Sequence, residues 1–161
     1  MKCIVICDAD ILIDYGCSNK KILQLVTQNL YEIWVPLPVW EEVKDLSEKD
    51  AENLGLRIVE PTLEAVIEAS SMHGGSLSDE DNICFIIARD EKAICATNDK
   101  HLREKCERHS IRVIWGLEMM VQLYDLGKLS QEIAESTARK ISENNPAITK
   151  EIIEKFLKLI R

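Results

Sequence analysis

The chain alternates between short, almost wholly apolar runs and longer stretches with helical spacing. Such runs are typical of a parallel sheet whose two faces are both covered by helices. They cover residues 3–7, 32–35, 56–60, 93–96 and 111–115. Helices are predicted between the runs at about residues 9–17, 20–29, 38–48, 62–72, 78–91, 99–109 and 117–126. The alternation predicts an α/β fold with three layers, α/β/α, around a central, mainly parallel sheet of about five strands.

Two further helical patterns follow Gly127. The second has apolar residues at the i, i+3 and i+4 spacing of an amphipathic helix. These residues are Ile152, Ile153, Phe156, Leu157 and Ile160. We therefore divide the chain into an α/β domain, residues 1–129, and an appended helical pair, residues 130–161, that packs on the same unit or on a second copy. The helices carry more apolar surface than short strands are expected to cover, which predicts a homodimer.

Composition narrows the class of protein. The chain has 161 residues, of which 46% are hydrophobic and 30% charged, as expected of one folded domain rather than a disordered chain. Its longest apolar run, residues 83–88, is far shorter than the roughly 20 residues that span a bilayer. Asp8 and Asp10 interrupt the first apolar stretch before the core of a signal peptide could form. We therefore expect a cytoplasmic protein without membrane contact, with six reduced cysteines that lack zinc-site spacing.

Charge is unevenly distributed along the chain. The formal net charge is -8, but residues 1–99 hold 8 basic and 19 acidic side chains, whereas residues 100–112 carry five basic and two acidic ones. This balance argues against nucleic-acid binding by bulk charge, so any such contact is expected to be local. Lys100 and Arg103 are the candidates for such a nucleic-acid contact. With 3 Trp, 3 Tyr and 2 Phe in the whole chain, a platform for stacked bases is not expected.

Acidic residues follow several of the predicted strands. Asp8 comes directly after the first apolar run, Asp99 closes the segment after the fourth, and Glu42 lies beyond the second. In a parallel sheet, ligands bind outside the carboxyl ends of the strands, so these side chains are expected to converge at one edge. The first turn of the helix that begins near residue 78 adds three more acids, Asp79, Glu80 and Asp81.

Converging carboxylates need a compensating positive charge. Each pair about 4 Å apart repels by about 4 kcal/mol at an effective dielectric constant near 20. Mg²⁺ and similar hard cations are held by a few carboxylates together with water and phosphate oxygens. Such an ion activates water and stabilises charge on a phosphodiester. The sequence has no P-loop, nucleophile elbow or His-rich metal motif that would offer another centre, so it predicts a Mg²⁺ or Mn²⁺ site.

The ordered set of motifs resembles the PIN-domain ribonucleases, a family that includes the VapC-type toxins of toxin-antitoxin pairs. The resemblance rests on I-V-I-C-D-A-D-I-L at residues 4–12, Glu42-Val43, L-S-D-E-D at residues 77–81 with Ala88, and Thr97-Asn98-Asp99, and it covers residues 3 to about 129. The tail also resembles the helical C-terminus of one PIN subgroup. The resemblance implies an RNA substrate, a small antitoxin protein as a partner, and a catalytic, metal-binding quartet of Asp8, Glu42, Asp81 and Asp99.

Some positions depart from the family pattern or compete for one role. Asp10 stands where the family usually has Asn or Ser, and a carboxylate there is expected to join the metal shell or to raise the pKa of a neighbour. Asp79, Glu80 and Asp81 compete for the third position. The distance to Ala88 favours Asp81, with Glu80 second. Thr97 and Asn98 are further accessory candidates.

Two other functions start from the same residues. Asp8-Ala9-Asp10 resembles the D-x-D motif of haloacid-dehalogenase-like phosphatases, with Asp8 as nucleophile and Asp10 as acid or base. That family's Thr or Val at the position of Leu12 and its later G-D-x-x-x-D motif are absent. The second alternative is a catalytically silent PIN-like module that binds RNA or a protein. The acids also have structural interpretations, because Asp8, Asp81 and Asp99 are each placed to cap a helix.

Overall fold

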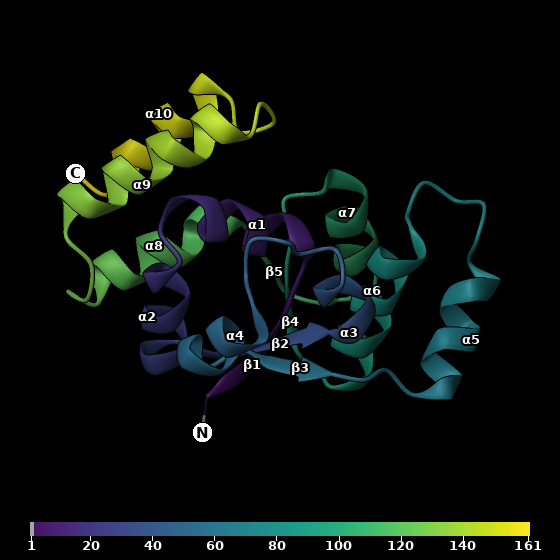
Figure 1. The fold of residues 1–161 in the computed structure, drawn as a ribbon. Helices are drawn as coiled ribbons and strands as arrows, with labels where there is room; N and C mark the ends of the chain where they lie inside the picture. Colours follow the sequence, from purple (N-terminus) through teal and green to yellow (C-terminus); the bar gives the residue numbers. More distant parts are fainter. Residues whose placement is uncertain (1) are drawn as a thin grey trace.

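A five-stranded parallel sheet forms the centre of the molecule in the computed structural model, which describes residues 2–161. The strand order is β3-β2-β1-β4-β5, so β1 lies in the middle (Figure 1). The strands are β1 (Cys3–Cys7), β2 (Tyr31–Pro36), β3 (Arg57–Val59), β4 (Ile94–Ala96) and β5 (Val113–Ile114). Val5, Ile6 and Cys7 of β1 are fully buried. The predicted α/β class and the parallel central sheet are confirmed.

Helices follow each strand, because neighbouring parallel strands need a crossover to return the chain to the same end of the sheet. They are α1 (Ala9–Ser18), α2 (Lys21–Asn29), α3 (Leu37–Trp40), α4 (Glu48–Leu54), α5 (Leu63–Ser71), α6 (Asp79–Asp90), α7 (Lys100–Arg108), α8 (Gly116–Asp125), α9 (Gln131–Asn144) and α10 (Lys150–Leu159). Several begin at the side chain that the sequence offers as an N-cap, a Ser, Thr or Asp whose oxygen accepts a backbone N–H of the first turn. In the described part of the chain, no helix is long and apolar enough to cross a membrane.

The prediction of one helix over residues 38–48 is wrong. Helix α3 ends at Trp40, and α4, which was not predicted, begins after Ser47. The side chain of Ser47 accepts the N–H of Asp50, whose carboxylate accepts the N–H of Ser47, and this capping box starts the new helix. Glu42 therefore lies in a turn between two helices and not on a helix, and its N–H donates to the carbonyl three residues back.

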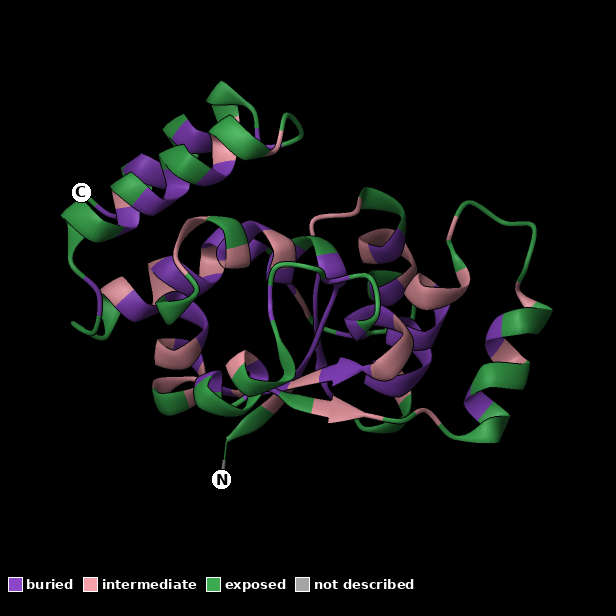
Figure 2. Cartoon of the chain, in the orientation of Figure 1, coloured by how far each residue is buried: buried purple, intermediate pink, exposed green. Residues whose placement is uncertain are grey.

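The C-terminal hairpin packs on the body of the same chain. Helix α9 lies against α1 and α8, and α10 lies against α8 and α9. Figure 2 shows the buried stripe on both helices, and Ile153, Phe156 and Leu157 in α10 belong to the same continuous core as the sheet. The chain therefore covers this stripe itself, which is the first of the two arrangements that the sequence left open. The homodimer stays a prediction.

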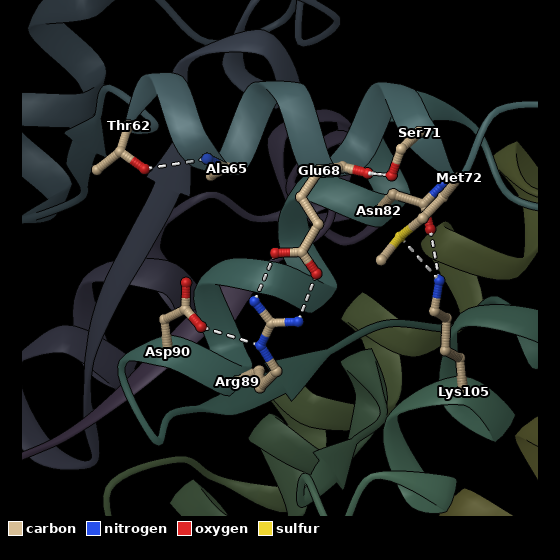
Figure 3. Close-up of polar contacts among 9 residues, drawn as sticks. All are labelled: Thr62, Ala65, Glu68, Ser71, Met72, Asn82, Arg89, Asp90 and Lys105. Atoms are coloured by element: carbon tan, nitrogen blue, oxygen red, sulfur yellow. Dashed lines mark hydrogen bonds and ion pairs between the residues drawn. The ribbon is translucent and has the colours of Figure 1, made fainter.

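Helix α5 stands at the outer edge of the molecule and is tied to α6 by charge (Figure 1). The guanidinium of Arg89 donates two hydrogen bonds to the carboxylate of Glu68, at 2.6 and 2.7 Å, and its Nε donates to Asp90 at 2.9 Å (Figure 3). The opposite face of α5 leaves Leu63 and Ile67 exposed. Helix α5 therefore packs on α6, and residues 72–78 lead from it to the acidic first turn of α6.

Candidate functional site

Asp8 lies at the carboxyl end of the central strand and is almost wholly buried, with 7% of its surface exposed. One carboxylate oxygen accepts the N–H of Ala9 at 2.8 Å, and the other accepts the hydroxyl of Thr97 at 2.9 Å. Burial, followed by the negative charges of Asp81 and Asp10, raises the pKa of Asp8 to about 7, against the lowering effect of these hydrogen bonds. A capping role alone does not require a buried carboxylate among other acids.

Thr97 joins Asp8 to the end of the neighbouring strand β4. Its hydroxyl donates to Asp8 and accepts the backbone N–H of Asp99 at 3.0 Å. Asp99 in turn caps α7 through the N–H of Leu102 at 2.9 Å. The parallel pairing of β1 with β4 places the two strand ends side by side, which is why residues about 90 positions apart meet here. Thr97 is fully buried.

Asp81 approaches the same edge from the first turn of α6. It forms a capping box with Ser78, in which Ser78 N–H donates to the carboxylate at 3.2 Å and Asp81 N–H donates to the hydroxyl at 3.1 Å. Burial raises the pKa of Asp81, and the charges of Asp99 and Asp10 raise it as well, although the contacts with Ser78 lower it. Asp81 therefore has both the structural and the electrostatic role that the sequence left open.

Glu42 and Glu80 are less buried than Asp8, since Glu42 is exposed and Glu80 is half-buried. Burial raises the pKa of Glu42, followed by the charges of Glu80, Asp81 and Asp10. Glu42 and Asp10 are themselves exposed. The negative charges of Asp10, Glu80, Asp81 and Asp99 thus contribute to the raised pKa of Asp8, Glu42 or Asp81. We call these six residues, Asp8, Asp10, Glu42, Glu80, Asp81 and Asp99, the acid cluster.

Asp79 is the acid of the α6 first turn that lies apart. Its carboxylate is 3.4 Å from the ring of His73, in the loop before the helix. Of the three acids that competed for one role, Asp81 and Glu80 belong to the acid cluster. The charge of Asp79 is not among the causes that shift the pKa of Asp8, Asp81 or Glu42. Asp79 is thus a matched control for its neighbours.

The acid cluster lacks a compensating cation among the described residues. No Lys or Arg is among the groups that shift the pKa of Asp8, Glu42 or Asp81. Carboxylate and hydroxyl oxygens are the ligands that Mg²⁺ and Mn²⁺ prefer, so the chemistry of the donors fits such an ion. Within residues 2–161, however, no three His, Cys, Asp or Glu side chains stand close enough together to hold a metal ion. The metal-binding quartet of Asp8, Glu42, Asp81 and Asp99 therefore stays a prediction.

The two RNA-contact candidates take different positions on α7. Lys100 is exposed, with its ammonium 3.9 Å from Glu104. The guanidinium carbon of Arg103 lies 5.2 Å from the ring centre of Trp115. Trp115 was not predicted from the sequence, although it follows β5 as Asp8 follows β1. Only acidic residues were considered at the strand ends, and Trp115 is an exposed aromatic residue at the same edge of the sheet.

Comparison with known proteins finds a likeness of fold among solved structures but none in sequence. No family model matches the chain, and no curated protein is significantly similar to it in sequence. Among solved structures, the fold is similar to that of a PilT N-terminus domain protein from the hyperthermophilic archaeon Sulfolobus solfataricus P2, with 12% sequence identity and a TM-score of 0.49. The alignment covers 74% of this chain and 92% of that chain. This likeness concerns the fold, and the chemistry of the site rests on the side chains of this chain alone.

Proposed function

We propose that the chain is an endoribonuclease that hydrolyses RNA phosphodiester bonds with Mg²⁺ or Mn²⁺ at the acid cluster. The observation that carries this proposal is the buried Asp8, which lies at the end of the central strand among acids whose charge no basic side chain offsets. A buried carboxylate among like charges is costly unless a cation binds. The toxin of a toxin-antitoxin pair is one setting for this activity, with a small antitoxin protein as partner.

The burial of each side chain indicates the role that it would have in metal binding. Asp8 is held rigidly by Ala9 and Thr97, so it would provide the fixed ligand. Asp81 and Asp99 are oriented by the helices that they cap, and Glu42, on an exposed turn, can adjust. When bound, a divalent cation supplies an activated water and stabilises the charge that develops on the phosphodiester. The cluster leaves that charge to the cation, because it has no cationic side chain of its own.

The burial of Asp8 also has a consequence for proton uptake. With a pKa near 7, the carboxyl of Asp8 is partly protonated at neutral pH when no cation is present. A carboxylate must lose its proton to bind a metal ion, so cation binding would release protons from the cluster.

The test is cleavage of a single-stranded RNA with Mg²⁺ or Mn²⁺, with excess EDTA as the control. We expect cleavage that depends on the metal ion, and we expect Asp81→Asn to lower the cleavage rate at least tenfold. Asp79 lies two residues earlier, with its side chain near His73, and Asp79→Asn should leave the rate within about twofold. Full activity in EDTA, or equal loss in both variants, would contradict the proposal.

The same preparation separates the phosphatase alternative. A haloacid-dehalogenase-like enzyme would hydrolyse a phosphomonoester through a phosphorylated Asp8. Turnover of p-nitrophenyl phosphate without RNA cleavage would favour that enzyme, and binding of RNA without either reaction would favour a silent RNA-binding module.

A further inference from the structure

A small cavity lies beside the acid cluster, between the α/β body and the C-terminal hairpin. Its volume is about 220 Å³. Asn98, Arg103 and Trp115 line it from the body, and Ile148 and Ile152 line it from the hairpin. This is smaller than the roughly 300–1,000 Å³ of a pocket for a drug-sized molecule, which suits a single flat ring system. The hairpin therefore forms one wall of a cavity in addition to packing on the core.

The body side of the cavity offers a flat aromatic surface and a flat cation. Trp115 is 43% exposed, although most large apolar side chains of the chain are buried. The guanidinium of Arg103 lies over its ring. Unpaired nucleobases stack on both aromatic rings and guanidinium planes. A single tryptophan is sufficient for one base, so the small number of aromatic residues in the sequence does not exclude this contact.

Three consecutive residues connect the wall of the cavity to the acid cluster along the chain. Thr97 donates to Asp8, Asp99 caps α7, and Asn98 between them lines the cavity. The amide oxygen of Asn98 accepts the N–H of Gly116 at 3.0 Å, which fixes the backbone next to Trp115. Because Asn98 is the chain neighbour of both Thr97 and Asp99, an RNA strand that presented a phosphodiester to the acid cluster would bring an adjoining nucleotide toward this wall of the cavity.

Charge favours a nucleic acid over an apolar protein segment as the occupant. Arg103 forms no ion pair with any carboxylate of residues 2–161, so its charge at the cavity is uncompensated by the protein. Residues 100–112 as a whole carry five basic and two acidic side chains, in a chain with a net charge of -8. A polyanion that also carries flat apolar rings complements both the cation and the indole.

We propose that this cavity receives one unpaired nucleobase of the RNA, stacked on Trp115 and Arg103, next to the bond presented to the acid cluster. The inference rests on the proposed function and deepens it, because it restricts the substrate to RNA that is single-stranded at this position. A base paired in a duplex cannot leave its stack to enter the cavity without additional cost. The C-terminal hairpin then takes part in substrate binding through Ile148 and Ile152.

The test measures binding with a full-length Asp8→Asn protein, so that the RNA is not consumed. The probes are a labelled uridine hexamer and a hexamer of the same length whose nucleotides are all abasic, measured by fluorescence anisotropy. Trp115→Ala is expected to weaken binding of the uridine hexamer at least about fivefold, the lower end of base-stacking effects, and to leave the abasic hexamer unchanged. The matched control is Trp34→Ala, which removes the other tryptophan beneath an arginine, Arg57 at 4.5 Å, and is expected to change neither affinity.

A second measurement keeps an aromatic ring at residue 115. The uridine hexamer should quench tryptophan emission of the Asp8→Asn protein, and Trp115→Phe should remove most of that quenching while retaining most of the affinity. Equal binding of both hexamers with no effect of Trp115→Ala overturns the inference, even if metal-dependent cleavage is found. Loss of self-association in Trp115→Ala, with RNA binding unchanged, overturns it in favour of a protein contact. If neither hexamer binds, the inference fails, whereas the proposed function is decided separately by metal-dependent cleavage with the wild type.

Discussion

The hydroxyl of Thr97 donates to the carboxylate of Asp8 at 2.9 Å and accepts the N–H of Asp99 at 3.0 Å. One buried hydroxyl thus fixes acids that come from the ends of two different strands. It also stabilises the ionised form of Asp8, because a hydrogen bond donated to a carboxylate lowers its pKa.

Thr97→Val should remove both hydrogen bonds while keeping the volume of the side chain. We expect a loss of about 1–3 kcal/mol in the free energy of unfolding, because the Asp99 N–H and the Asp8 carboxylate each lose a partner. Cleavage should fall about tenfold, since Asp8 would be protonated over a wider range of pH. Thr97→Ser keeps the hydroxyl and should retain most of both properties in urea unfolding and cleavage assays. Equal losses in the two variants would contradict this role.

Asp8→Asn should be neutral or stabilising by on the order of 1 kcal/mol in metal-free buffer, although it removes activity. The substitution takes a buried negative charge out of a cluster that includes Asp10 and Asp81. Saturating Mn²⁺ should raise the melting temperature of the wild type, because ligand binding to the native state stabilises it, and should barely move that of the variant. If the variant loses about 1 kcal/mol in the free energy of unfolding and Mn²⁺ raises the melting temperature of neither protein, Asp8 is a structural cap.

The free energy of unfolding should depend on pH through the ionisation of the buried Asp14. The carboxylate of Asp14 accepts hydrogen bonds from the side chain of Asn145 in the hairpin at 3.0 and 3.3 Å. Burial raises its pKa to about 6, opposed by the Asn145 contact and assisted by the charge of Asp10. A carboxyl whose pKa is raised by folding destabilises the fold when ionised, so the penalty is present above about pH 6 and disappears below the unfolded value of 3.8. The free energy of unfolding of Asp14→Asn should therefore be about 1 kcal/mol larger than that of the wild type near pH 7.5. This difference should disappear near pH 4.

Urea unfolding of the wild type and Asp14→Asn at the two pH values measures this difference directly. Asn145→Ala is the control, because it removes the donor but leaves the carboxyl. It should destabilise the protein at both pH values, and more at the higher one, where Asp14 is ionised. A stability difference between the wild type and Asp14→Asn that does not change with pH would contradict the assignment.

Arg89→Ala should loosen α5 without unfolding the sheet. The two hydrogen bonds from Arg89 to Glu68 are the charged contact between α5 and α6, and both side chains are more than a third exposed. Partly exposed pairs contribute modestly, so we expect a global loss below about 1 kcal/mol. Amide exchange should nevertheless speed up in residues 63–71, since local opening requires fewer contacts to break. Asp90→Ala, which removes the other partner of Arg89, should leave exchange in α5 close to that of the wild type.

The sequence predicted the strands and most helices because their apolar spacing and caps are local signals. Asp8 and Asp99 were also found from sequence, since strand-end position alone places them at one edge. The turn around Glu42 could not be found in this way, because its apolar residues are spaced as in a helix and only the capping box at Ser47 separates it from α4. The hairpin stripe was recognised, but its partner surface on α8 and α9 depends on tertiary packing that a linear pattern does not contain.

The central claim is that the acid cluster cleaves RNA with a divalent cation, and it is tested most directly by single-turnover cleavage of a single-stranded RNA with saturating Mn²⁺. The wild type, Asp8→Asn and Asp79→Asn should be compared at the same pH. The account predicts that Asp8→Asn lowers the cleavage rate at least a hundredfold, about 3 kcal/mol of barrier, while Asp79→Asn stays within about twofold of the wild type. Cleavage by Asp8→Asn at the rate of the wild type, or undiminished cleavage by the wild type in excess EDTA, would contradict it.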